Sequence, residues 1–485
     1  MRSRLRADTA LYATAVLLDR LLGFLMLPFL TRAITPQDYG VWTQTAVTAG
    51  LLVPLVVFAF PTAIVRYFSA AVGPGVRARF FDRLGATSLL LYITVATLAL
   101  LGAGSFAAWA YGDTPVGPAL VPPLLGLIAA DAGIEFAVAW LRAAGRMGGV
   151  VVVLVLRSLL RYGALLALVG WGGVGAALAV WLPPYALLQC GLALAVTAVT
   201  RWQLRSRAEA VVMAEATSLR ELLRFAAPLV LLAGFTALNG VLDRFLLVRW
   251  LGLETVAVYA AAVSLASIPA VFHSVLGFTL FPVLARHWGE RRVDEAARLM
   301  AQAMQVYLFL CLPVALAIAL AGPWGLPLLA TQHYSPDPAV FAWLGVSVTA
   351  FGLYQILLYA LLLDGRSLQV LALAIVATTI NLLLNLLLAA RHGAAGAAAA
   401  AAGSNLTMVL LAARLARAVL PWRFPCASAW ALAWRAALAA LPLGWVAAQD
   451  QPGGAAMAGA LAAGALLYLG LDLARRGSVA RSLRP

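Results

Sequence analysis

The apolar residues of this chain fall into blocks of roughly 20, the length of helix that crosses the ~30 Å hydrocarbon core of a bilayer. Fourteen such blocks are found in the 485 residues. Hydrophobic residues make up 64% of the chain and charged residues 11%, whereas soluble domains are more charged and less apolar. The pattern predicts an all-α polytopic membrane protein with about 14 transmembrane helices. The predicted spans are 10–31, 41–64, 86–110, 118–141, 149–169, 173–199, 226–249, 255–283, 299–321, 339–363, 367–389, 394–413, 427–447 and 454–473.

The basic residues alternate in abundance from one predicted loop to the next. All 34 of them are Arg, and 26 lie in one set of alternating segments that includes both termini. The opposite set carries only Arg32, Arg249 and Arg391. Because cytoplasmic loops are enriched in basic residues, we expect both termini in the cytoplasm. Since the arginines are scattered over short loops, the net charge of +15 does not indicate binding to nucleic acid.

Three short motifs recur along the chain at a nearly constant offset of 221 to 224 residues, which indicates an internal duplication. The two units would each hold six spans, so both would insert the same way up. Parallel halves of this kind are a known transporter plan, with the substrate site between them near the bilayer midplane. The recurring motifs are Leu18-Asp19-Arg20 with Leu242-Asp243-Arg244, Phe60-Pro61 with Phe281-Pro282, and Gly172-x-x-Gly175 with Gly393-x-x-Gly396.

The duplication predicts a domain organisation of two pseudo-symmetric six-helix lobes followed by two C-terminal helices. The longest outside loop, about 322–338, is too short to hold a catalytic domain. The predicted segments are an N-terminal lobe 1–200, a cytoplasmic linker 201–225, a C-terminal lobe 226–418, two additional transmembrane helices 427–474 and a cytoplasmic tail 475–485.

Two arginines lie deep in the fifth predicted span. Arg157 and Arg161 are four residues apart and share one helix face, roughly 12 and 18 Å along the helix from Gly149. A charge at that depth costs at least ~2.5–3.5 kcal/mol on insertion scales, so each needs a partner or a water-filled cavity. Asp131 and Glu135 of the preceding span could pair with them, or the arginines could bind an anion. The two interpretations are compatible.

Other intramembrane polar residues carry weaker signals. Asp19 and Arg20, and their repeat partners Asp243 and Arg244, are neighbours that point about 100° apart on a helix, so the two residues of each couple do not pair directly. Arg435 lies near the inner end of its span, where we expect its side chain to snorkel toward the interface. The amides of Asn381 and Asn385 are offset by 224 from the two deep arginines and predict hydrogen bonds between packed helices.

Several kinds of chemistry are not indicated by the sequence. The four histidines and three cysteines are dispersed and have no metal-ligand spacing. There is no Walker motif, no Rossmann fingerprint and no nucleophile elbow. We therefore expect no metal or other cofactor, and a transporter rather than an enzyme.

Four segments together resemble the polysaccharide transporter family of the MOP flippase superfamily, which comprises the Wzx-type flippases of O-antigen and exopolysaccharide repeat units. The resemblance covers the whole chain in order. It implies two lobes that open alternately to cytoplasm and periplasm around a cationic cavity, in a bacterial cytoplasmic (inner) membrane. The segments are the Leu-Asp-Arg helix continuing as FLMLPFLTRAITPQDYGVW, then LDRFLLVRWLGLETVAVYAAAVSLASIP, FPVLARHWGERR and NLLLNLLLAARHGAAGAAAAAAG.

The resemblance implies a cargo, an undecaprenyl-diphosphate-linked oligosaccharide moved from the inner to the outer leaflet for lipopolysaccharide or exopolysaccharide synthesis. The expected partners are this glycan, membrane lipids and a polysaccharide polymerase with its chain-length machinery, and we expect a monomer. The diphosphate is expected to bind Arg157 and Arg161 with support from Arg20 and Arg244. Weak sugar contacts are expected from Tyr185, Gln189, Gln355, Asn381 and Asn385, and ion coupling from Asp131, Glu135, Asp19 and Asp243.

Three alternatives stay open at this point. The lipid II flippase of the same superfamily also has fourteen spans. A cation-coupled multidrug exporter usually has twelve, which argues against it. A membrane-embedded polysaccharide polymerase or ligase would need a sizeable outside loop with catalytic groups.

Overall fold

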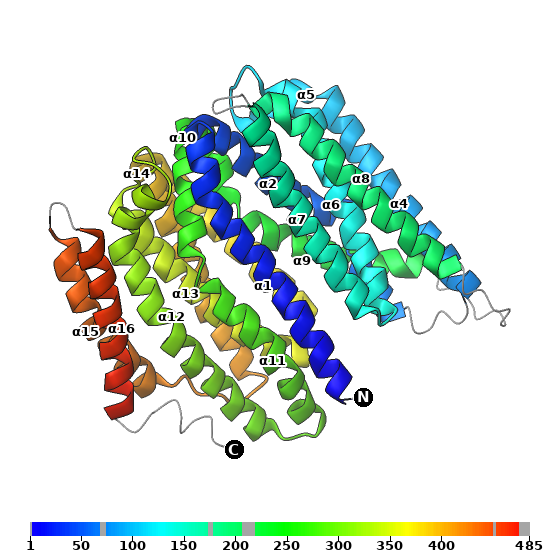
Figure 1. Ribbon diagram of the computed structural model, residues 1–485. Coiled ribbons are helices and arrows are strands. Elements are labelled where there is room, and N and C mark those ends of the chain that lie inside the picture. Colours follow the sequence, from blue (N-terminus) through cyan, green and yellow to red (C-terminus); the bar gives the residue numbers. More distant parts are fainter. Residues whose placement is uncertain (1, 68–73, 173–177, 206–218, 450–452, 475–485) are drawn as a thin grey trace. The chain divides into compact units, whose positions relative to one another are not determined.

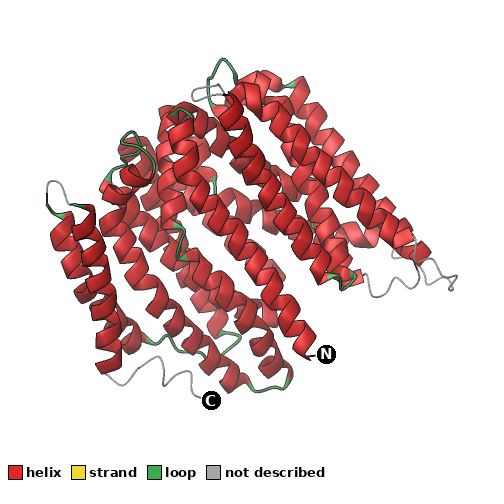
Figure 2. Cartoon of the chain, viewed as in Figure 1, coloured by secondary structure: helices red, strands yellow, loops and turns green. Residues whose placement is uncertain are grey.

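The computed structural model describes residues 2–67, 74–172, 178–205, 219–449 and 453–474, and this part of the chain is helical without a strand (Figures 1 and 2). Gly175, most of the predicted linker and the predicted tail lie outside the described residues. The helices are α1 (Arg2–Ala33), α2 (Pro36–Val57), α3 (Phe60–Tyr67), α4 (Pro74–Leu101), α5 (Ala103–Tyr111), α6 (Gly117–Ala143), α7 (Met147–Gly172), α8 (Leu178–Arg205), α9 (Leu219–Asn239), α10 (Leu242–Ala266), α11 (Ala270–Gly289), α12 (Val293–Leu329), α13 (Pro338–Leu363), α14 (Ser367–Arg417), α15 (Cys426–Ala447) and α16 (Gly454–Ala474).

Thirteen of the described helices are long and apolar enough to cross a membrane. One of them, α14, comprises two predicted spans, because the chain turns at Gly393 with φ 57° and ψ −134°. Positive φ is readily adopted only by glycine. Close packing after the turn requires a second glycine, since a Cβ on Gly396 would lie 2.1 Å from the Leu388 carbonyl oxygen. The prediction of an all-α protein with about 14 spans is confirmed.

Several predicted spans are interrupted where the sequence disfavours a continuous helix. The predicted span 226–249 is divided at Gly240 between α9 and α10. The predicted span 255–283 is divided between α10 and α11, just before Pro269 takes the N-cap position of α11. Proline disfavours the helical region for the residue before it and has no backbone N–H to donate, and both effects favour a break at this point. A further turn occurs inside α10 at Gly252, where φ is 81°.

The chain forms two compact units, Met1–Ala257 and Val258–Pro485. In the first unit α6 is central, packing against α2, α3, α5, α7 and α8. Its C-terminal end carries an aromatic cluster in which Trp140 contacts Phe81 and Phe136, with ring centroids 5.2 and 6.2 Å apart. In the second unit α13 packs against α12 and α14, and the pair α15 and α16 packs against α12.

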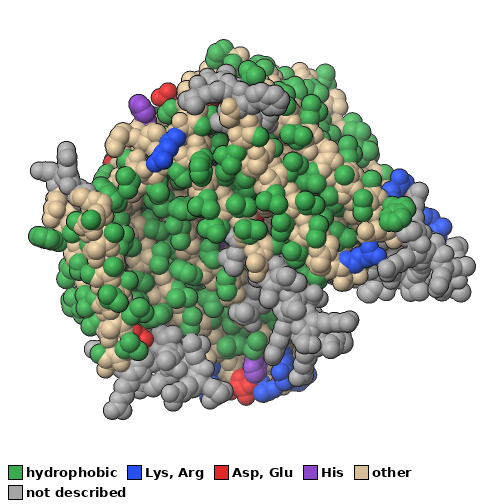
Figure 3. Space-filling model, in the orientation of Figure 1, with side chains coloured by type: hydrophobic (Ala, Val, Ile, Leu, Met, Phe, Trp, Pro, Cys, Tyr) green, Lys and Arg blue, Asp and Glu red, His purple; other side chains and the backbone are tan. Residues whose placement is uncertain are grey.

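The surface has the polarity expected of a protein solvated by lipid. Many large aliphatic side chains are exposed, among them Leu101 at 83% and Leu187 at 73%. Figure 3 shows hydrophobic side chains over the middle of the visible face, and the charged side chains lie near its margins. Lipid tails replace water around such residues, so this exposure carries no hydrophobic penalty in a bilayer.

Candidate functional site

The fifth predicted span corresponds to α7, and Arg157 of α7 contacts α6. The Arg157 Nη2 atom lies 2.6 Å from Asp131 Oδ1, and the two side chains are 25% and 29% exposed. This ion pair is one of the contacts expected from the spacing of the charges. Glu135 lies one turn further along α6 and is exposed, with the charge of Arg157 nearby. The pair is therefore only half-buried and has a second carboxylate beside it.

Arg161 lies one turn beyond Arg157 and lines a small cavity. The other side chains on its wall include Asp131 of α6, Trp42 of α2, and Tyr185 and Gln189 of α8. The guanidinium of Arg161 lies close to the Tyr185 hydroxyl. The structure thus brings four of the predicted site residues, namely Asp131, Arg161, Tyr185 and Gln189, around one space.

The cavity holds about 20 Å³, which is room for about one water molecule. The Gln189 side chain is buried, and its Nε2 atom has no hydrogen-bond partner among the described residues. A buried amide without a partner costs about 1–3 kcal/mol, so this group needs a water or a ligand. A diphosphate does not fit the cavity in this conformation, and the helices around it would have to separate to admit one.

Trp42 was not predicted as a site residue. Its ring lies edge-on to Tyr185, with centroids 5.3 Å apart, and 6.0 Å from that of Trp181. A single aromatic residue in an apolar helix gives no distinctive sequence signal, since most such residues pack in a core. Trp42 and Tyr185 together form an aromatic wall next to Arg161.

Asp19 of α1 is tied to α7. Its Oδ1 atom accepts a 2.7 Å hydrogen bond from the Ser158 hydroxyl, and its backbone carbonyl accepts one of 3.3 Å from the Tyr162 hydroxyl. Ser158 adjoins Arg157 in the sequence, so the contact places a third carboxylate close to the arginine face of α7. The neighbouring Arg20 is exposed, as expected for two residues that point in different directions.

Asp243 and Arg244, the repeat partners of Asp19 and Arg20, make different contacts. Asp243 stands in the first turn of α10 and its Oδ1 atom accepts a hydrogen bond from the Arg244 backbone N–H, at 2.8 Å. A carboxylate at this position stabilises the helix N-terminus. The Arg244 side chain donates to the Gly240 carbonyl oxygen at 3.3 Å. Both side chains therefore contribute locally to the break between α9 and α10.

The predicted polar residues of the second unit are less accessible. Asn381 and Asn385 are buried, and the Asn385 Nδ2 atom donates to Asn381 Oδ1 at 2.7 Å. This bond lies within one helix, whereas Ser404, after the turn of α14, donates to the Ala377 carbonyl oxygen before it at 2.9 Å. Gln355 of α13 is half-buried. The asparagines are buried, and the hydrogen bonds that Asn385 donates go to Asn381 of the same helix and not across to another helix.

The expectation that Arg435 snorkels is wrong. Its Nη1 atom donates to Asp472 Oδ1 at 2.8 Å, and the two side chains are only 7% and 11% exposed. Close to this pair, the Tyr468 hydroxyl donates to the Phe309 carbonyl oxygen at 3.0 Å. A buried carboxylate lowers the cost of keeping Arg435 at this depth, so the side chain has no need to reach the interface.

An apolar groove of about 540 Å³ runs along α12, α15 and α16. Its wall consists of aliphatic and aromatic side chains with small residues such as Ala439 and Gly464 at the base. Gly464 is required there, because a Cβ would lie 2.5 Å from the Ala439 carbonyl oxygen. The groove can accept an extended hydrocarbon chain and has almost no polar group to offer one.

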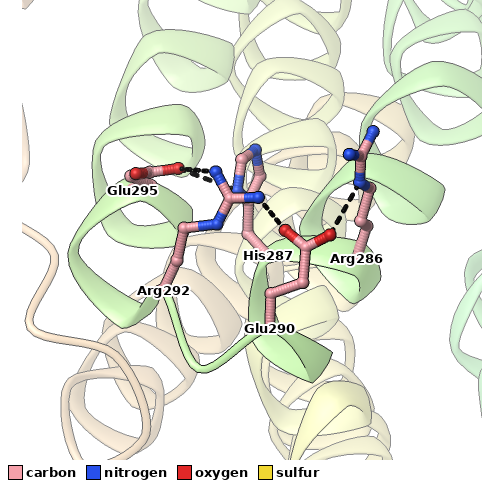
Figure 4. Close-up of polar contacts among 5 residues, drawn as sticks. All are labelled: Arg286, His287, Glu290, Arg292 and Glu295. Carbon is pink, nitrogen blue, oxygen red and sulfur yellow. Dashed lines mark hydrogen bonds and ion pairs between the residues drawn. The ribbon is translucent and has the colours of Figure 1, made fainter.

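A charged network joins α11 to α12 at the turn between them (Figure 4). The carboxylate of Glu290 pairs with Arg286 and Arg292, and that of Glu295 pairs with Arg292 and lies 3.0 Å from His287 Nδ1. Exposed ion pairs of this kind contribute little stability individually. Each acid is shared between neighbours in the same turn, so the network shapes the turn and leaves no unbalanced charge for a ligand.

Among the described residues there is no group of three or more His, Cys, Asp or Glu side chains that could hold a metal ion. The chemistry available at the α6–α7–α8 cluster is therefore that of guanidinium, carboxylate, phenol and amide groups. Such a set can bind an anion and exchange a proton.

Comparisons with known proteins agree on one family of folds. A family model described as polysaccharide biosynthesis protein matches residues 5–288, and one described as lipid II flippase MurJ matches residues 151–450. No functionally curated protein matches the chain significantly.

Solved structures with the same fold are similar over nearly the whole chain. The lipid II flippase MurJ in an inward closed conformation gives a TM-score of 0.76 at 11% identity and covers 96% of this chain and 99% of that one. A MATE transporter in a bent conformation gives 0.56 at 18% identity, with 90% and 96% covered. A MOP superfamily transporter from Pyrococcus furiosus gives 0.54 at 14% identity, with 86% and 94% covered. At these identities the likeness concerns the fold.

Proposed function

This chain belongs to the polysaccharide biosynthesis protein family of the MOP flippase superfamily, and we propose that it flips an undecaprenyl-diphosphate-linked oligosaccharide repeat unit. The cargo would move from the cytoplasmic to the periplasmic leaflet by alternating access, for the synthesis of a cell-surface polysaccharide. The families that match are flippases and transporters, not enzymes. The chain is thus a multi-pass membrane transport protein, and the direction, the cargo and the orientation of its termini are the proposal.

The observation that supports this cargo best is the guanidinium of Arg161, which lines the cavity with Asp131 and Asp19 nearby. Arg157 is paired with Asp131, whereas no carboxylate among the described residues forms an ion pair with Arg161. Transferring a diphosphate into apolar surroundings without charged or hydrogen-bonding partners would require far more free energy than binding could supply. A planar guanidinium offers forked, charge-assisted hydrogen bonds to phosphate oxygens. Arg161 is therefore proposed as the primary diphosphate ligand.

The neighbours of Arg161 suit the rest of the headgroup. Trp42 and Tyr185 present an aromatic wall, and the free Nε2 atom of Gln189 can donate to a sugar hydroxyl. Arg157 could exchange Asp131 for a phosphate oxygen when the cargo arrives. Arg20 and Arg244 remain supporting groups, and Gln355, Asn381 and Asn385 remain weak sugar contacts of the opened transporter.

The apolar groove along α12, α15 and α16 supports a lipid-linked cargo over a water-soluble one. A polyprenyl chain is too long and too apolar to enter a polar cavity, so it must stay in contact with hydrocarbon while the headgroup moves. A wall of aliphatic and aromatic side chains meets that need through burial of apolar surface.

Coupling is proposed to involve the carboxylates near the arginines. Asp131 and Glu135 are one turn apart on α6, and both lie close to Arg157 of α7. Asp19 is a third acid at the same face of α7. One of these groups would exchange a proton or bind a cation as the transporter changes conformation. Asp243 is the analogous candidate in α10.

The direct test is genetic and chemical together. Deleting the gene should stop one specific polysaccharide from reaching the cell surface while its undecaprenyl-diphosphate-linked precursor accumulates inside. The lesion should be complemented by the wild-type chain. Normal surface polysaccharide in the deletion strain, with no precursor accumulation, would contradict the proposal.

A second candidate is a lipid II flippase, which the family match over residues 151–450 and the TM-score of 0.76 favour over a multidrug exporter. Depletion separates the two cargoes, since loss of lipid II flipping stops cell-wall synthesis and lyses the cell. Survival of the deletion strain with an intact wall would favour the oligosaccharide repeat unit. Glycosyltransferase genes beside this one would point the same way.

A further inference from the structure

A second groove, unrelated to the arginine cluster, lies in the first unit between α4, α6 and α8. Its volume is about 600 Å³. Its floor is built from small residues, including Gly85 and Ala86 of α4, Ala129 and Gly133 of α6, and Ala193 of α8. These three helices pack against one another (Figure 1), so the hollow results from missing side-chain volume and not from a gap between separate parts.

The wall of this groove is largely apolar, because three of its polar side chains donate hydrogen bonds to backbone carbonyl oxygens. The Tyr92 hydroxyl donates to the Leu125 carbonyl oxygen at 3.2 Å, and the Cys190 thiol donates to the Gly126 carbonyl oxygen at 3.1 Å. The Ser88 hydroxyl donates to the Val56 carbonyl oxygen at 2.9 Å. A ligand between these three groups would therefore meet mostly hydrocarbon, with Thr197 as a further hydroxyl on the wall.

One end of the groove is charged. Arg201 Nε and Nη2 donate to the two carboxylate oxygens of Asp82, at 2.7 and 3.0 Å. The pair is open to its surroundings, with the side chains 48% and 34% exposed. Arg79 and Arg83 are exposed on α4 at the same end. Three arginines against one aspartate give this end a positive excess.

The length of the groove matches one leaflet. From Asp82 to Tyr92, α4 rises about 15 Å, half of a ~30 Å hydrocarbon core. The arginine end lies in a segment that the Arg distribution predicts to be cytoplasmic, where the leaflet surface is anionic. An acyl chain of a phospholipid in that leaflet would fill the groove from its headgroup inward.

We propose that this groove is a binding site for one anionic phospholipid of the cytoplasmic leaflet, with an acyl chain between α4, α6 and α8 and its phosphate on Arg201. Basic pockets between membrane helices on this side are suited to anionic headgroups. The bond to Asp82 uses Nε and Nη2 of Arg201, and Nη1 is not part of it. A phosphate on Nη1 would lie close to the Asp82 carboxylate, whose negative charge opposes its binding.

Because Arg201 attracts the phosphate and Asp82 repels it, replacing Arg201 and replacing Asp82 should change phospholipid binding in opposite directions. Native mass spectrometry of the purified full chain, titrated with phosphatidylglycerol, should show one retained lipid and weaker binding of phosphatidylethanolamine. Arg201→Gln should weaken phosphatidylglycerol binding at least about tenfold, as expected for loss of a charge-assisted bond. Asp82→Asn should strengthen it, because the negative charge that opposes the phosphate is gone.

Two matched controls separate this site from general lipid contact. Ala86→Trp fills the groove and should weaken binding, whereas Ala195→Trp places the same ring on an exposed position of α8 that does not line the groove. Arg366→Gln removes an arginine of the second unit that pairs with Asp364 at 2.5 Å and does not line the groove, and it should change nothing. Thermal unfolding of each variant checks that it is folded.

Four results would overturn the proposal. They are equal binding of the two phospholipids, equal weakening by Arg201→Gln and Arg366→Gln, weaker binding after Asp82→Asn, and no effect of Ala86→Trp. Recovery of a polyprenyl phosphate as the retained lipid would also overturn it, because the groove would then belong to the transported cargo.

Discussion

Among the described residues, the Arg157–Asp131 pair of the first compact unit and the Arg435–Asp472 pair of the second each join two membrane helices, and the two pairs are built differently. The Arg157–Asp131 pair of α7 and α6 is 25% and 29% exposed, with further charges around it. The Arg435–Asp472 pair of α15 and α16 is 7% and 11% exposed. Their bond lengths, 2.6 and 2.8 Å, are similar.

The difference shows that an intramembrane ion pair does not by itself indicate a transport site. At Arg435 one cation meets one anion, both are buried, and Tyr468 fixes the helix to α12 nearby. At Arg157 the same pair is extended by Arg161, Glu135 and Asp19, so the cluster has several ways to distribute its charges. A balanced pair stabilises packing, whereas an expandable cluster can exchange a partner for a ligand.

The largest effect should come from Arg161→Ala. We expect it to abolish export of the polysaccharide while the protein inserts and folds normally, because the diphosphate loses its main ligand. Arg161→Lys should be partly active, since it keeps the charge and loses the forked geometry. Surface polysaccharide is measured against folded protein in the membrane. If the arginine is only structural, folded protein should fall instead, and Asp131→Asn with Arg161→Ala should restore both it and transport.

The opposite outcome is expected at the second pair. Asp472→Ala leaves the Arg435 guanidinium buried without its partner, and breaking a buried pair costs about 3–5 kcal/mol. Thermal unfolding in detergent should register that loss, while the protein that remains folded still transports. Replacing both residues together, as Arg435→Met with Asp472→Leu, should recover most of the stability. A specific transport defect in the double variant would show that this pair has the same role as Arg157 and Asp131.

A smaller effect is expected from the carboxylates of α6. Asp131→Asn and Glu135→Gln should each reduce gradient-driven transport, by roughly tenfold if one protonation state in the cycle is removed. Binding of the cargo without a gradient should change less. The measurement is uptake of a labelled lipid-linked glycan into proteoliposomes with and without a proton gradient. If both variants respond to the gradient as the wild type does, these acids do not couple transport.

The smallest effect is expected from the asparagines at the positions of α14 that correspond to the arginines of α7. Asn385→Ala removes a hydrogen bond between neighbouring turns of one helix, and even side-chain hydrogen bonds across membrane helices contribute only about 0.6 kcal/mol on average. The unfolding temperature should fall slightly and transport should stay close to normal. A transport loss comparable to that of Arg161→Ala would mean that the amide face of α14 binds cargo directly.

The contact between α6 and α7 is the part of the site that the sequence predicts best. The spacing of Arg157 and Arg161, and of Asp131 and Glu135 in the preceding span, was enough to predict that these helices meet, because residues four apart share a face. Residue spacing on one helix face does not identify Asp472 as the partner of Arg435. It lies 37 residues from Arg435, near the end of another span, where a carboxylate is easily taken for an interfacial residue.

The aromatic and hydroxyl side chains that contact the charged residues of the site could not be identified from the sequence either. Trp42 and Ser158 are ordinary residues for a membrane helix, and only tertiary packing places them beside Arg161 and Asp19. Helix breaks were partly foreseeable, since Gly240 and Pro269 are evident in the sequence. Whether a glycine or proline in a membrane helix breaks it depends on its neighbours, so the division into α9, α10 and α11 could not be read from the sequence.

The turn at Gly393 has a consequence for how the chain enters the membrane. The two arms of α14 are joined without a loop, and Gly396 lets the second arm pack directly on the Leu388 carbonyl. Neither arm can cross the bilayer far ahead of the other, because no slack connects them. They must enter as a hairpin, with helix–helix contact already formed near the turn. A side chain at position 393 or 396 would therefore act during biosynthesis, by separating two spans before the rest of their unit has assembled around them.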